Sequence, residues 1–357
     1  MSTLTAVAMS GGVDSSVAAT LLAKRGAPLV GFSMQLVPDV KGGRCCSLED
    51  FKDAAAVASR LGFPHHVLDM QEVFKAKILD PFAQDYAQGR TPSPCVRCNT
   101  YLKFDALLDR ARAVGASKVA TGHYAIFEYS PRTGRTLLRA AADPDKDQSY
   151  FLFDLSDEQR ASAELPLGRL TKPEVRDIAR AAGLLTAEKP ESMDLCFASK
   201  GESYHEVLAR GGLTSDAAAG EIVAKNGDKL GTHEGISRFT IGQRRGLGIA
   251  SSSPLYVVEL DATNHRVVVG DEKDLYRESC TVERVRWIPF DRPSGPVTAT
   301  IRIRSNHAGA QASIVDHGDG TASIRFDTPQ RAVAPGQAAV FYDDDLVLGG
   351  GWIAAAA

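Results

Sequence analysis

The first part of the chain alternates short apolar runs with a segment of helical periodicity. Apolar residues dominate Thr5–Met9 and Pro28–Leu36, which predicts two strands. Between them, Asp14–Arg25 carries apolar residues at helical spacing and is followed by Gly26, a residue type that often ends helices. This order is typical of a βαβ unit with parallel strands.

The same alternation continues as far as about residue 125. The residues from Ser47 to Asp50 resemble a helix N-terminal cap, and this helix is expected to reach Leu61 and to stop at Gly62. The elements predicted next are a strand over Pro64–Leu68, a helix over Gln71–Gln88, a loop over Gly89–Cys98, a helix over Asn99–Val114 and a strand over Lys118–Ala125. Together they predict an α/β fold with a doubly wound parallel sheet.

The pattern changes after about Tyr204. Gly227-Asp228 fits a hairpin turn between Glu221–Ala224 and Lys229–Leu230. From about Cys280 onward, apolar and polar residues alternate between turn residues, which predicts a small antiparallel β-barrel. Its expected strands are Val297–Arg304, Ala310–Asp316, Thr321–Phe326 and Ala338–Tyr342. The chain is therefore expected to divide into residues 1–204, a small central domain over 205–278, and a barrel over 279–357.

Composition is that of a chain that folds throughout. Hydrophobic residues make up 44% and charged residues 24% of the 357 residues, and this length suggests two or three domains. The formal net charge of -3 means that a nucleic-acid partner would need a local basic surface. The first residues include neither a basic segment nor an apolar run near the roughly 20 residues that span a bilayer, so we expect a cytoplasmic protein without a membrane partner.

Residues 10–16, Ser-Gly-Gly-Val-Asp-Ser-Ser, lie between the first predicted strand and the first predicted helix. Backbone amides and the helix dipole favour an anion there, and glycines allow a phosphate to approach closely. Asp14 would repel a pyrophosphate unless it held a cation, so we assign it to Mg²⁺. For any two of these residues alone, a glycine-rich turn with a helix cap would be the better interpretation.

This loop resembles that of pyrophosphatase-loop enzymes, which cut ATP between its α and β phosphates and adenylate a substrate oxygen. The resemblance implies a fold like the adenine nucleotide alpha hydrolases, with ATP and Mg²⁺ as cofactors. It implies ATP contacts from Ala8, Met9, Ser10, Gly11, Gly12, Val13, Asp14, Ser15, Met34 and Gly122. Enzymes with this loop include tRNA thiolases and ligases that deliver an amine, so the loop leaves the acceptor open.

Two of the six cysteines are candidates for sulfur chemistry. Cys98 is predicted at the N-terminus of a helix, a placement that lowers a thiol pKa and favours the thiolate. Cys196 provides a distant second thiol. Six unevenly spaced cysteines do not suit a secreted disulfide framework. For Cys45, Cys46 and Cys280, a buried structural role is an equal alternative.

Several segments resemble segments of the bacterial and mitochondrial tRNA-specific 2-thiouridylases, and they follow one another in the same order as in that family. They are Gly89–Asn99, Ala120–Tyr124, Asp145–Phe151, Ser192–Phe197, Thr240–Gly248 and Pro335–Gln337. The resemblance implies ATP-dependent adenylation and 2-thiolation of the wobble uridine of tRNA, with an ATP-binding domain, a central tRNA-binding domain and a barrel. By position, Cys98 is the nucleophile and Cys196 carries the persulfide.

The resemblance also implies partners and contacts. The tRNA contacts would be Ser93, Pro94, Cys95, His123, Lys146, Asp147, Gln148, Arg304, Ser305 and Gln337. Taken alone, His123 would more often be a strand-end histidine with internal hydrogen bonds. Sulfur would come from an upstream donor protein or from sulfide, and the free chain is expected to be a monomer.

The chemistry requires both thiols. A uridine carbonyl oxygen is a poor leaving group until it is adenylated, after which the persulfide sulfur on Cys196 can attack the activated carbon. Cys98 would resolve the persulfide or release sulfide from it. Many family members carry Asp where this chain has Cys95, so an acid-base role of that Asp cannot be transferred. Cys95, Cys98 and Cys196 could instead bind a [4Fe-4S] cluster with one open position. The persulfide and cluster mechanisms both stay open at this point.

Two arginine-rich stretches are candidate RNA surfaces. Residues 237–247 carry Arg238, Arg244 and Arg245 and no acid, and residues 281–310 carry five Arg, two acids and Trp287. Such runs are usually solvated faces, yet here they suit phosphate positioning. Outside the thiolase interpretation, the alternatives are another adenylating ligase acting on tRNA, and a tRNA-binding or iron-sulfur carrier protein.

Overall fold

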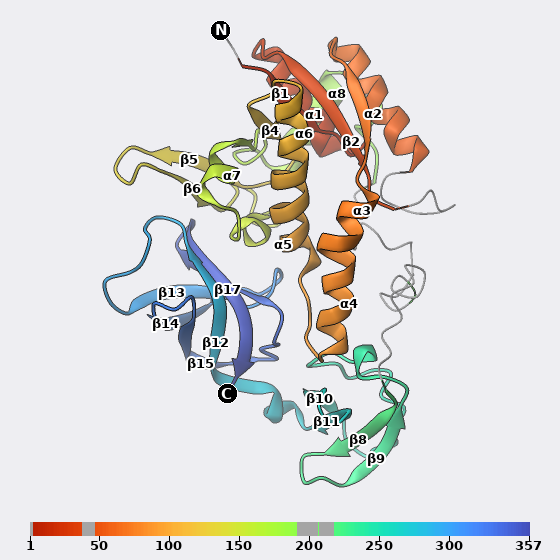
Figure 1. Cartoon of the computed structure of the whole chain (residues 1–357), viewed down its shortest axis with the longest axis vertical. Coiled ribbons are helices and arrows are strands. Elements are labelled where there is room, and N and C mark those ends of the chain that lie inside the picture. The colour runs from red at the N-terminus through yellow and green to blue at the C-terminus, as the bar shows by residue number, and fades with distance from the viewer. Residues whose placement is uncertain (1–2, 38–46, 191–205, 207–217) are drawn as a thin grey trace. The chain divides into compact units, whose positions relative to one another are not determined.

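The computed structural model describes residues 3–37, 47–190, 206 and 218–357 (Figure 1). The chain forms two compact units. The first contains residues 1–78, 95–207 and 345–347, and the second contains residues 79–94, 208–344 and 348–357. In the part of the chain that is described, no helix combines the length and the apolar character needed to cross a bilayer.

A parallel sheet in the order β3-β2-β1-β4-β7 forms the centre of the first unit. Its strands are β1 (Thr5–Ala8), β2 (Leu29–Gln35), β3 (His65–Asp69), β4 (Lys118–Ala120) and β7 (Ala163–Glu164). The chain runs outward from β1 to β3 and then returns to the other side of β1. The predicted doubly wound sheet is confirmed, and β1 and β4 flank the point where such sheets bind ligands.

Helices cover both faces of this sheet (Figure 1). On one face, α1 (Val13–Lys24), α2 (Leu48–Leu61) and α8 (Lys172–Ala181) bury apolar side chains against β1 and β2. On the other face, α6 (Leu107–Ala113) packs against Phe32 and Val119. Each face thus has its own hydrophobic core.

Helix α2 has the ends that its sequence predicts. Ser47 and Asp50 form a reciprocal capping box, in which each side chain bonds the other residue's backbone N–H at 3.1 Å. At the other end, Gly62 adopts φ +80°, the left-handed conformation that terminates helices. The capping signals therefore fix both ends of this helix.

The predicted loop over Gly89–Cys98 is wrong at its end. Helix α5 (Pro94–Cys98) continues into a π-helical stretch, η2 (Asn99–Ala106), and then into α6. Proline suits the first position of a helix, because its φ is already helical and its missing N–H has no role there. Cys95 therefore lies in the first turn and Cys98 follows it by about one turn, so the predicted place of Cys98 at a helix N-terminus is also wrong.

The other elements of this part of the chain include several that were not predicted. The helix expected over Gln71–Gln88 is divided into α3 (Gln71–Phe74), the π-helical η1 (Lys75–Leu79) and α4 (Asp80–Ala87). The strand expected over Lys118–Ala125 ends at Ala120, because the chain leaves the sheet where Gly122 packs against α1. The elements that follow are β5 (Ile126–Ser130), β6 (Arg135–Arg139), η3 (Ser149–Leu152) and α7 (Asp157–Ala161).

The second unit contains a small sheet in the order β10-β11-β8-β9. Its elements are β8 (Gly220–Ala224), β9 (Lys229–His233), η4 (Ile236–Arg238), β10 (Tyr256–Asp261), β11 (Arg266–Gly270) and η5 (Glu272–Leu275). Strands β8 and β9 form the predicted hairpin, with Gly227 at φ +93°. Ile222, Phe239, Val257 and Val267 are among the residues of its core.

An antiparallel barrel completes the second unit, and its presence confirms the prediction (Figure 1). Its strands are β12 (Tyr276–Trp287), β13 (Val297–Arg302), β14 (Ala310–Asp316), β15 (Ala322–Arg331), β16 (Ala338–Asp343) and β17 (Leu346–Ala356). They follow the order β12-β15-β14-β13-β16-β17, and pairing of β17 with β12 closes the barrel. The first and last of these strands were not predicted, because five of the twelve residues of β12 are charged and β17 contains three consecutive glycines.

Candidate active site

The loop after β1 is held by its own serines. The Ser10 N–H donates to Ser15 Oγ at 3.2 Å, and the hydroxyls of Ser15 and Ser16 donate to the Gly12 carbonyl at 3.2 and 2.8 Å. Gly12 is the N-cap of α1. No side chain at this N-cap accepts a hydrogen bond from the backbone N–H groups in the first turn of the helix. Amides in this position bind anions. The loop thus has the form that the sequence predicts for a phosphate site.

Two glycines let neighbouring segments approach this loop closely. Gly11 has φ +71°, and a Cβ at this position would lie 2.3 Å from the backbone oxygen of Asp50. A Cβ on Gly122 would lie 2.7 Å from the backbone of Asp14. Neither contact can relax by moving a side chain, so both positions require glycine. The N-terminus of α2 and the segment after β4 therefore both pack against the loop.

Asp14 already has a cation as its partner. Lys172 Nζ donates to its two carboxylate oxygens at 2.7 and 2.8 Å, and the Tyr124 hydroxyl donates to one of them at 2.7 Å. The Lys172 side chain is 9% exposed and that of Asp14 is 32% exposed, so solvent screens this ion pair only in part. Asp14 therefore has a cation of the protein itself as its partner, and its assignment to Mg²⁺ stays a prediction.

Tyr124 and Lys172 also hold the segment over residues 141–149. The Tyr124 N–H donates to the side-chain oxygen of Gln148 at 3.0 Å, and the Tyr124 carbonyl accepts from the Gln148 N–H at 2.8 Å. The backbone N–H of Lys172 donates to Asp143 at 2.8 Å. Asp147 accepts hydrogen bonds from the N–H groups of residues 141 and 149 within this segment. Asp147 and Gln148, two of the predicted tRNA contacts, thus build the segment that would present Lys146.

Cys95 and Cys98 belong to helix α5, the cysteine helix, and both lie in the first unit. Cys98 is buried at 7% exposure, whereas Cys95, three residues earlier and on the same side of the helix, is half-buried. The next residue, Asn99, donates from Nδ2 to the carbonyl of Phe151 at 3.0 Å. Cys196, Cys45 and Cys46 lie outside the described residues. Within the described ranges, no three His, Cys, Asp or Glu side chains are grouped as a metal would require.

His123 is buried at 8% exposure beside this helix. Its ring contacts Thr121 Oγ1 at 2.6 Å and Lys103 Nζ at 3.3 Å. Burial, together with the Lys103 charge, lowers the pKa of His123 well below its usual range. Lys103 has only donors, so Nε2 of a neutral His123 accepts and Nδ1–H donates to Thr121. The side chain has internal partners, and its contact with tRNA stays a prediction.

The predicted tRNA residues of the second unit differ in exposure and contacts. Gln337 donates from Nε2 to the carbonyls of Thr91 and Pro92 at 3.0 and 3.1 Å. Arg304 is half-buried and donates to the carbonyl of Arg331 at 3.3 Å, and Ser305 is exposed. Ser305 is thus accessible to a ligand, whereas Gln337 holds the backbone that precedes Ser93 and Pro94.

Two features of the expected basic surfaces need correction. Trp287 is 7% exposed and donates to Asp316 at 2.6 Å, so its ring belongs to the barrel and is not free to stack on RNA. Arg238 pairs with Glu234 at 2.8 Å, just outside the stretch that was counted as free of acids. Arg244 and Arg245 are exposed. Among the arginines of residues 237–247, these two are best placed for phosphate contacts.

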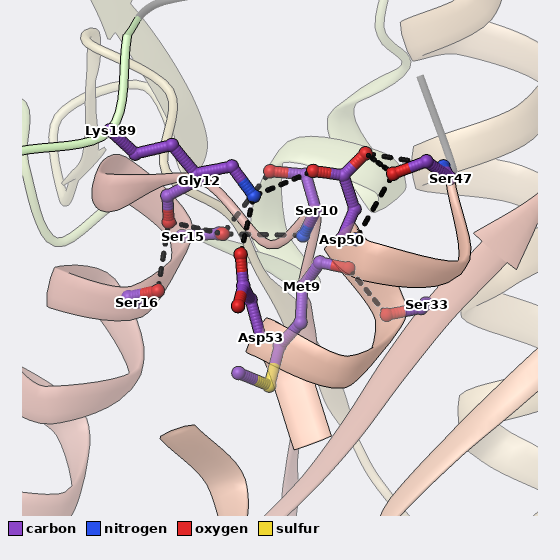
Figure 2. A network of polar contacts seen from close by, with 10 residues as sticks. All are labelled: Met9, Ser10, Gly12, Ser15, Ser16, Ser33, Ser47, Asp50, Asp53 and Lys189. Atoms are coloured by element: carbon purple, nitrogen blue, oxygen red, sulfur yellow. Dashed lines mark hydrogen bonds and ion pairs between the residues drawn. The ribbon is translucent and has the colours of Figure 1, made fainter. Parts of the chain in front are cut away.

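A second lysine that sequence reasoning missed lies near the nucleotide loop. Lys189 Nζ bonds Asp50 at 2.7 Å and Asp53 at 2.5 Å (Figure 2). Neither Lys189 nor Lys172 belongs to the loop motif, and their partners lie 139 and 158 residues away. No local pattern could have revealed these pairs.

Comparison with known proteins gives consistent matches along the chain. Residues 3–200 match the family of the tRNA methyl transferase HUP domain, residues 213–271 the tRNA methyl transferase PRC-barrel domain, and residues 277–353 the aminomethyltransferase beta-barrel domain. The first of these spans more than half of the chain.

Full-length relatives are also found. The chain is 48% identical over 364 residues to the tRNA-specific 2-thiouridylase of Solibacter usitatus and 46% identical over 366 residues to that of Acidobacterium capsulatum, with 98% of each chain covered in both cases. Among solved structures, the U34-tRNA thiolase of Methanococcus maripaludis is 18% identical with a TM-score of 0.36, over 60% of this chain and 67% of that one. That structural likeness is too weak to support an argument about function.

Proposed function

This chain belongs to the family of tRNA-specific 2-thiouridylases, and from that premise we propose that it replaces the 2-oxygen of the wobble uridine of tRNA with sulfur at the expense of ATP. The observation that carries this proposal is the match of 98% of the chain to 98% of a relative at 48% identity. The finer assignments below, including residue roles, rest on the resemblance of these residues to the family and, at the nucleotide loop and helix α5, on the local geometry as well.

Residues 8–15, Met34 and Gly122 bind ATP, and the loop amides and serine hydroxyls cradle its phosphates. The first turn of α1 supports this role, because its amides lack side-chain acceptors. Asp14 and the phosphate oxygens would hold Mg²⁺, since this ion usually takes one or two carboxylates plus phosphate oxygens. Bound there, Mg²⁺ would neutralise charge on the phosphates.

Sulfur reaches the uridine through two cysteines. Adenylation of the uridine 2-oxygen gives an AMP leaving group, and the terminal sulfur of a persulfide on Cys196 attacks carbon 2 as AMP departs. The Cys98 thiolate then attacks the Cys196 sulfur, which frees the 2-thiouridine and leaves a Cys98–Cys196 disulfide. A thiol reductant restores both thiols, and a donor protein or sulfide source renews the persulfide.

A [4Fe-4S] cluster on Cys95, Cys98 and Cys196 is the competing form of the sulfur site. Cys95 and Cys98 fit two positions of such a set, because a separation of three residues places both on one side of the helix. Anaerobic purification followed by iron and sulfide analysis distinguishes the two forms. Iron in proportion to active protein supports the cluster, and its absence from active protein supports the persulfide.

The RNA is bound by local cations rather than by overall charge; Arg244 and Arg245 are exposed, and Lys146 and Arg304 are half-buried. Lys146, Arg244, Arg245 and Arg304 contact tRNA phosphates, and the segment Ser93–Cys95 approaches the target base. Residues 1–204, 205–278 and 279–357 act as ATP-binding, central and barrel domains of a cytoplasmic enzyme that is a monomer without tRNA.

The experiment that tests this function uses one tRNA transcript with uridine at the wobble position. The wild-type protein, given ATP, Mg²⁺ and a sulfide source, should form 2-thiouridine together with AMP and pyrophosphate. Asp14→Asn should stop pyrophosphate release and leave tRNA affinity nearly unchanged. An enzyme that releases pyrophosphate with tRNA but adds an amine instead of sulfur would establish the ligase alternative.

A further inference from the structure

Lys189 and two aspartates of α2 form a charged cluster next to the nucleotide loop, outside every residue assigned above to ATP. The Lys189 ammonium bonds Asp50 Oδ1 at 2.7 Å and Asp53 Oδ2 at 2.5 Å. Figure 2 shows these three side chains close to Ser10, Gly12 and Ser15 of the loop. The Asp50 backbone packs directly against Gly11, so the cluster adjoins the loop.

The carboxylate of Asp50 is fixed in place. It belongs to the capping box of α2, in which its Oδ2 accepts from the backbone N–H and the hydroxyl of Ser47 at 3.1 and 2.7 Å. Its side chain is 15% exposed, and its backbone cannot move without displacing Gly11. Asp53, one turn later on α2, completes the pair of acceptors. Together they hold the ammonium at a defined place beside the loop.

Lys189 is anchored by its backbone as well. Its N–H donates to the carbonyl of Thr186 at 3.1 Å, and its own carbonyl accepts from Arg176 at 3.4 Å. Desolvation on its own lowers the pKa of Lys189, but the hydrogen bonds and charges of Asp50 and Asp53 outweigh it and raise the pKa above the usual value. The ammonium is therefore charged at neutral pH.

Charge and donor count both point to a further ligand. Two aspartates and one lysine leave a net charge of -1 beside a loop that is to bind a polyanion, a placement that is unfavourable unless the ammonium faces that anion. An ammonium has three N–H donors, and Asp50 and Asp53 use two of them. Across residues 3–37, 47–190 and 218–357, the third donor has no hydrogen-bond partner.

We propose that Lys189 is a further phosphate-binding residue of this enzyme, which donates its third N–H to an oxygen of the pyrophosphate part of ATP, and that Asp50 and Asp53 are the positioning residues that aim it. The proposal rests on the proposed function, because it takes residues 10–16 as the ATP loop. The ligand class is a di- or triphosphate, and a nucleoside monophosphate lacks the group that Lys189 would bind.

The test compares two probes, inorganic pyrophosphate and AMP, by calorimetric titration of the full-length protein in the presence of Mg²⁺. Lys189→Met keeps most of the side-chain length and removes the charge. It should weaken pyrophosphate binding by about tenfold to a hundredfold, the usual effect of losing a hydrogen bond to a charged group, and leave AMP affinity unchanged. Lys52→Met, an exposed lysine on the same helix as Asp50 and Asp53, is the matched control and should change neither affinity.

Two further variants separate binding from a purely structural tie between Lys189 and α2. Lys189→Arg keeps the charge and several donors, so it should retain most of the pyrophosphate affinity. Asp53→Asn leaves the capping box intact and removes one of the two aiming carboxylates, so it should weaken pyrophosphate binding less than Lys189→Met does. This variant also serves if Lys189→Met fails to fold.

The outcomes are distinct. Selective loss of pyrophosphate affinity supports the proposal. Equal losses for pyrophosphate and AMP, or no loss for either, overturn it and leave Lys189 as a structural residue. If the wild-type protein itself binds neither pyrophosphate nor AMP, the proposed function fails as well, and the two failures can be told apart.

Discussion

The ammonium of Lys172 lies 2.7 and 2.8 Å from the two carboxylate oxygens of Asp14, although the two residues are 158 positions apart in the chain. This pair connects the first turn of α1 to the first turn of α8 across one face of the parallel sheet. It gives the nucleotide loop an internal counterion. The pair therefore bears on both the stability and the charge of the site.

Lys172→Met should lower both the stability of the protein and the rate of pyrophosphate release. The change leaves Asp14 with one neutral donor, Tyr124, and loses a hydrogen-bonded ion pair that is partly buried, which should cost about 1–3 kcal/mol of unfolding free energy. The rate of pyrophosphate release should fall at least tenfold, since the carboxylate is no longer held. Urea unfolding and a pyrophosphate assay measure the two effects, with Lys24→Met at the exposed far end of α1 as the control. A variant with wild-type rate and stability would remove Lys172 from the site.

Serine substitutions of the cysteines should separate the two sulfur mechanisms. If a persulfide operates, Cys98→Ser and Cys196→Ser stop thiolation, AMP formation with tRNA survives, and Cys95→Ser is mild. If three thiolates bind a cluster, Cys95→Ser loses iron and thiolation as completely as the other two variants. The assays must be anaerobic, because oxygen destroys an exposed cluster. Loss of AMP formation in Cys98→Ser would contradict both mechanisms.

Cys280 should be inert in the folded protein. It is 3% exposed in the barrel, and burial raises the pKa of its thiol to about 12. Iodoacetamide at pH 8 should therefore leave Cys280 unlabelled until denaturant is added, as mass spectrometry of peptides can show. Cys280→Ser should remain active. Rapid labelling of native protein at Cys280 would show that the barrel opens there.

The raised pKa of Cys280 also predicts the direction in which stability changes at alkaline pH. The Cys280 thiol has a pKa of 9.0 in the unfolded chain, whereas the folded protein keeps the proton until about pH 12. Between these values the folded state binds more protons, so the contribution of Cys280 to stability falls as the pH rises above 9.

His123 should make the protein sensitive to acid. Its pKa is lowered well below 6.5 by burial, so the folded protein keeps it neutral while the unfolded chain binds a proton as the pH falls below that value. The unfolding free energy should therefore decrease on acidification. Between pH 7.5 and 5.5, His123→Gln should lose about 1 kcal/mol less than the wild type in urea titrations. The other buried histidines are present in both proteins, so an identical loss would mean that His123 titrates normally.

The parts of the fold that follow from local signals could be predicted from the sequence. Helix α2 begins after Ser47 and ends before Gly62, because a capping box and a left-handed glycine are local features. The order of strands and helices around the loop of residues 10–16 also follows from short-range periodicity. Helix α5 was missed because a proline at a first helical position and a proline in a loop look alike in sequence.

The candidate site could be predicted only in part. The loop residues stand together in the chain, and their contacts lie within about five residues of one another. Lys172 and Lys189 reach the site from α8 and the segment after it, and the direction of a lysine side chain depends on packing that is not local. The burial of single side chains could not be predicted either. Trp287 was included in a candidate RNA surface from the sequence, yet its side chain is buried in the barrel.

The hydrogen bonds around Thr91 have a consequence for the order in which the chain can mature on the ribosome. The Thr91 N–H donates to the carbonyl of Pro335 at 2.7 Å, and Gln337 donates to the Thr91 carbonyl from 246 positions later in the chain. Protein synthesis proceeds at about 5–20 residues per second, and early domains commonly fold before late ones appear. The segment that leads into the cysteine helix must therefore wait, with its polar backbone solvated, for more than ten seconds after it emerges. A ribosome that stalls before residue 335 would release a chain whose parallel sheet can form but whose residues 91 and 92 lack these partners.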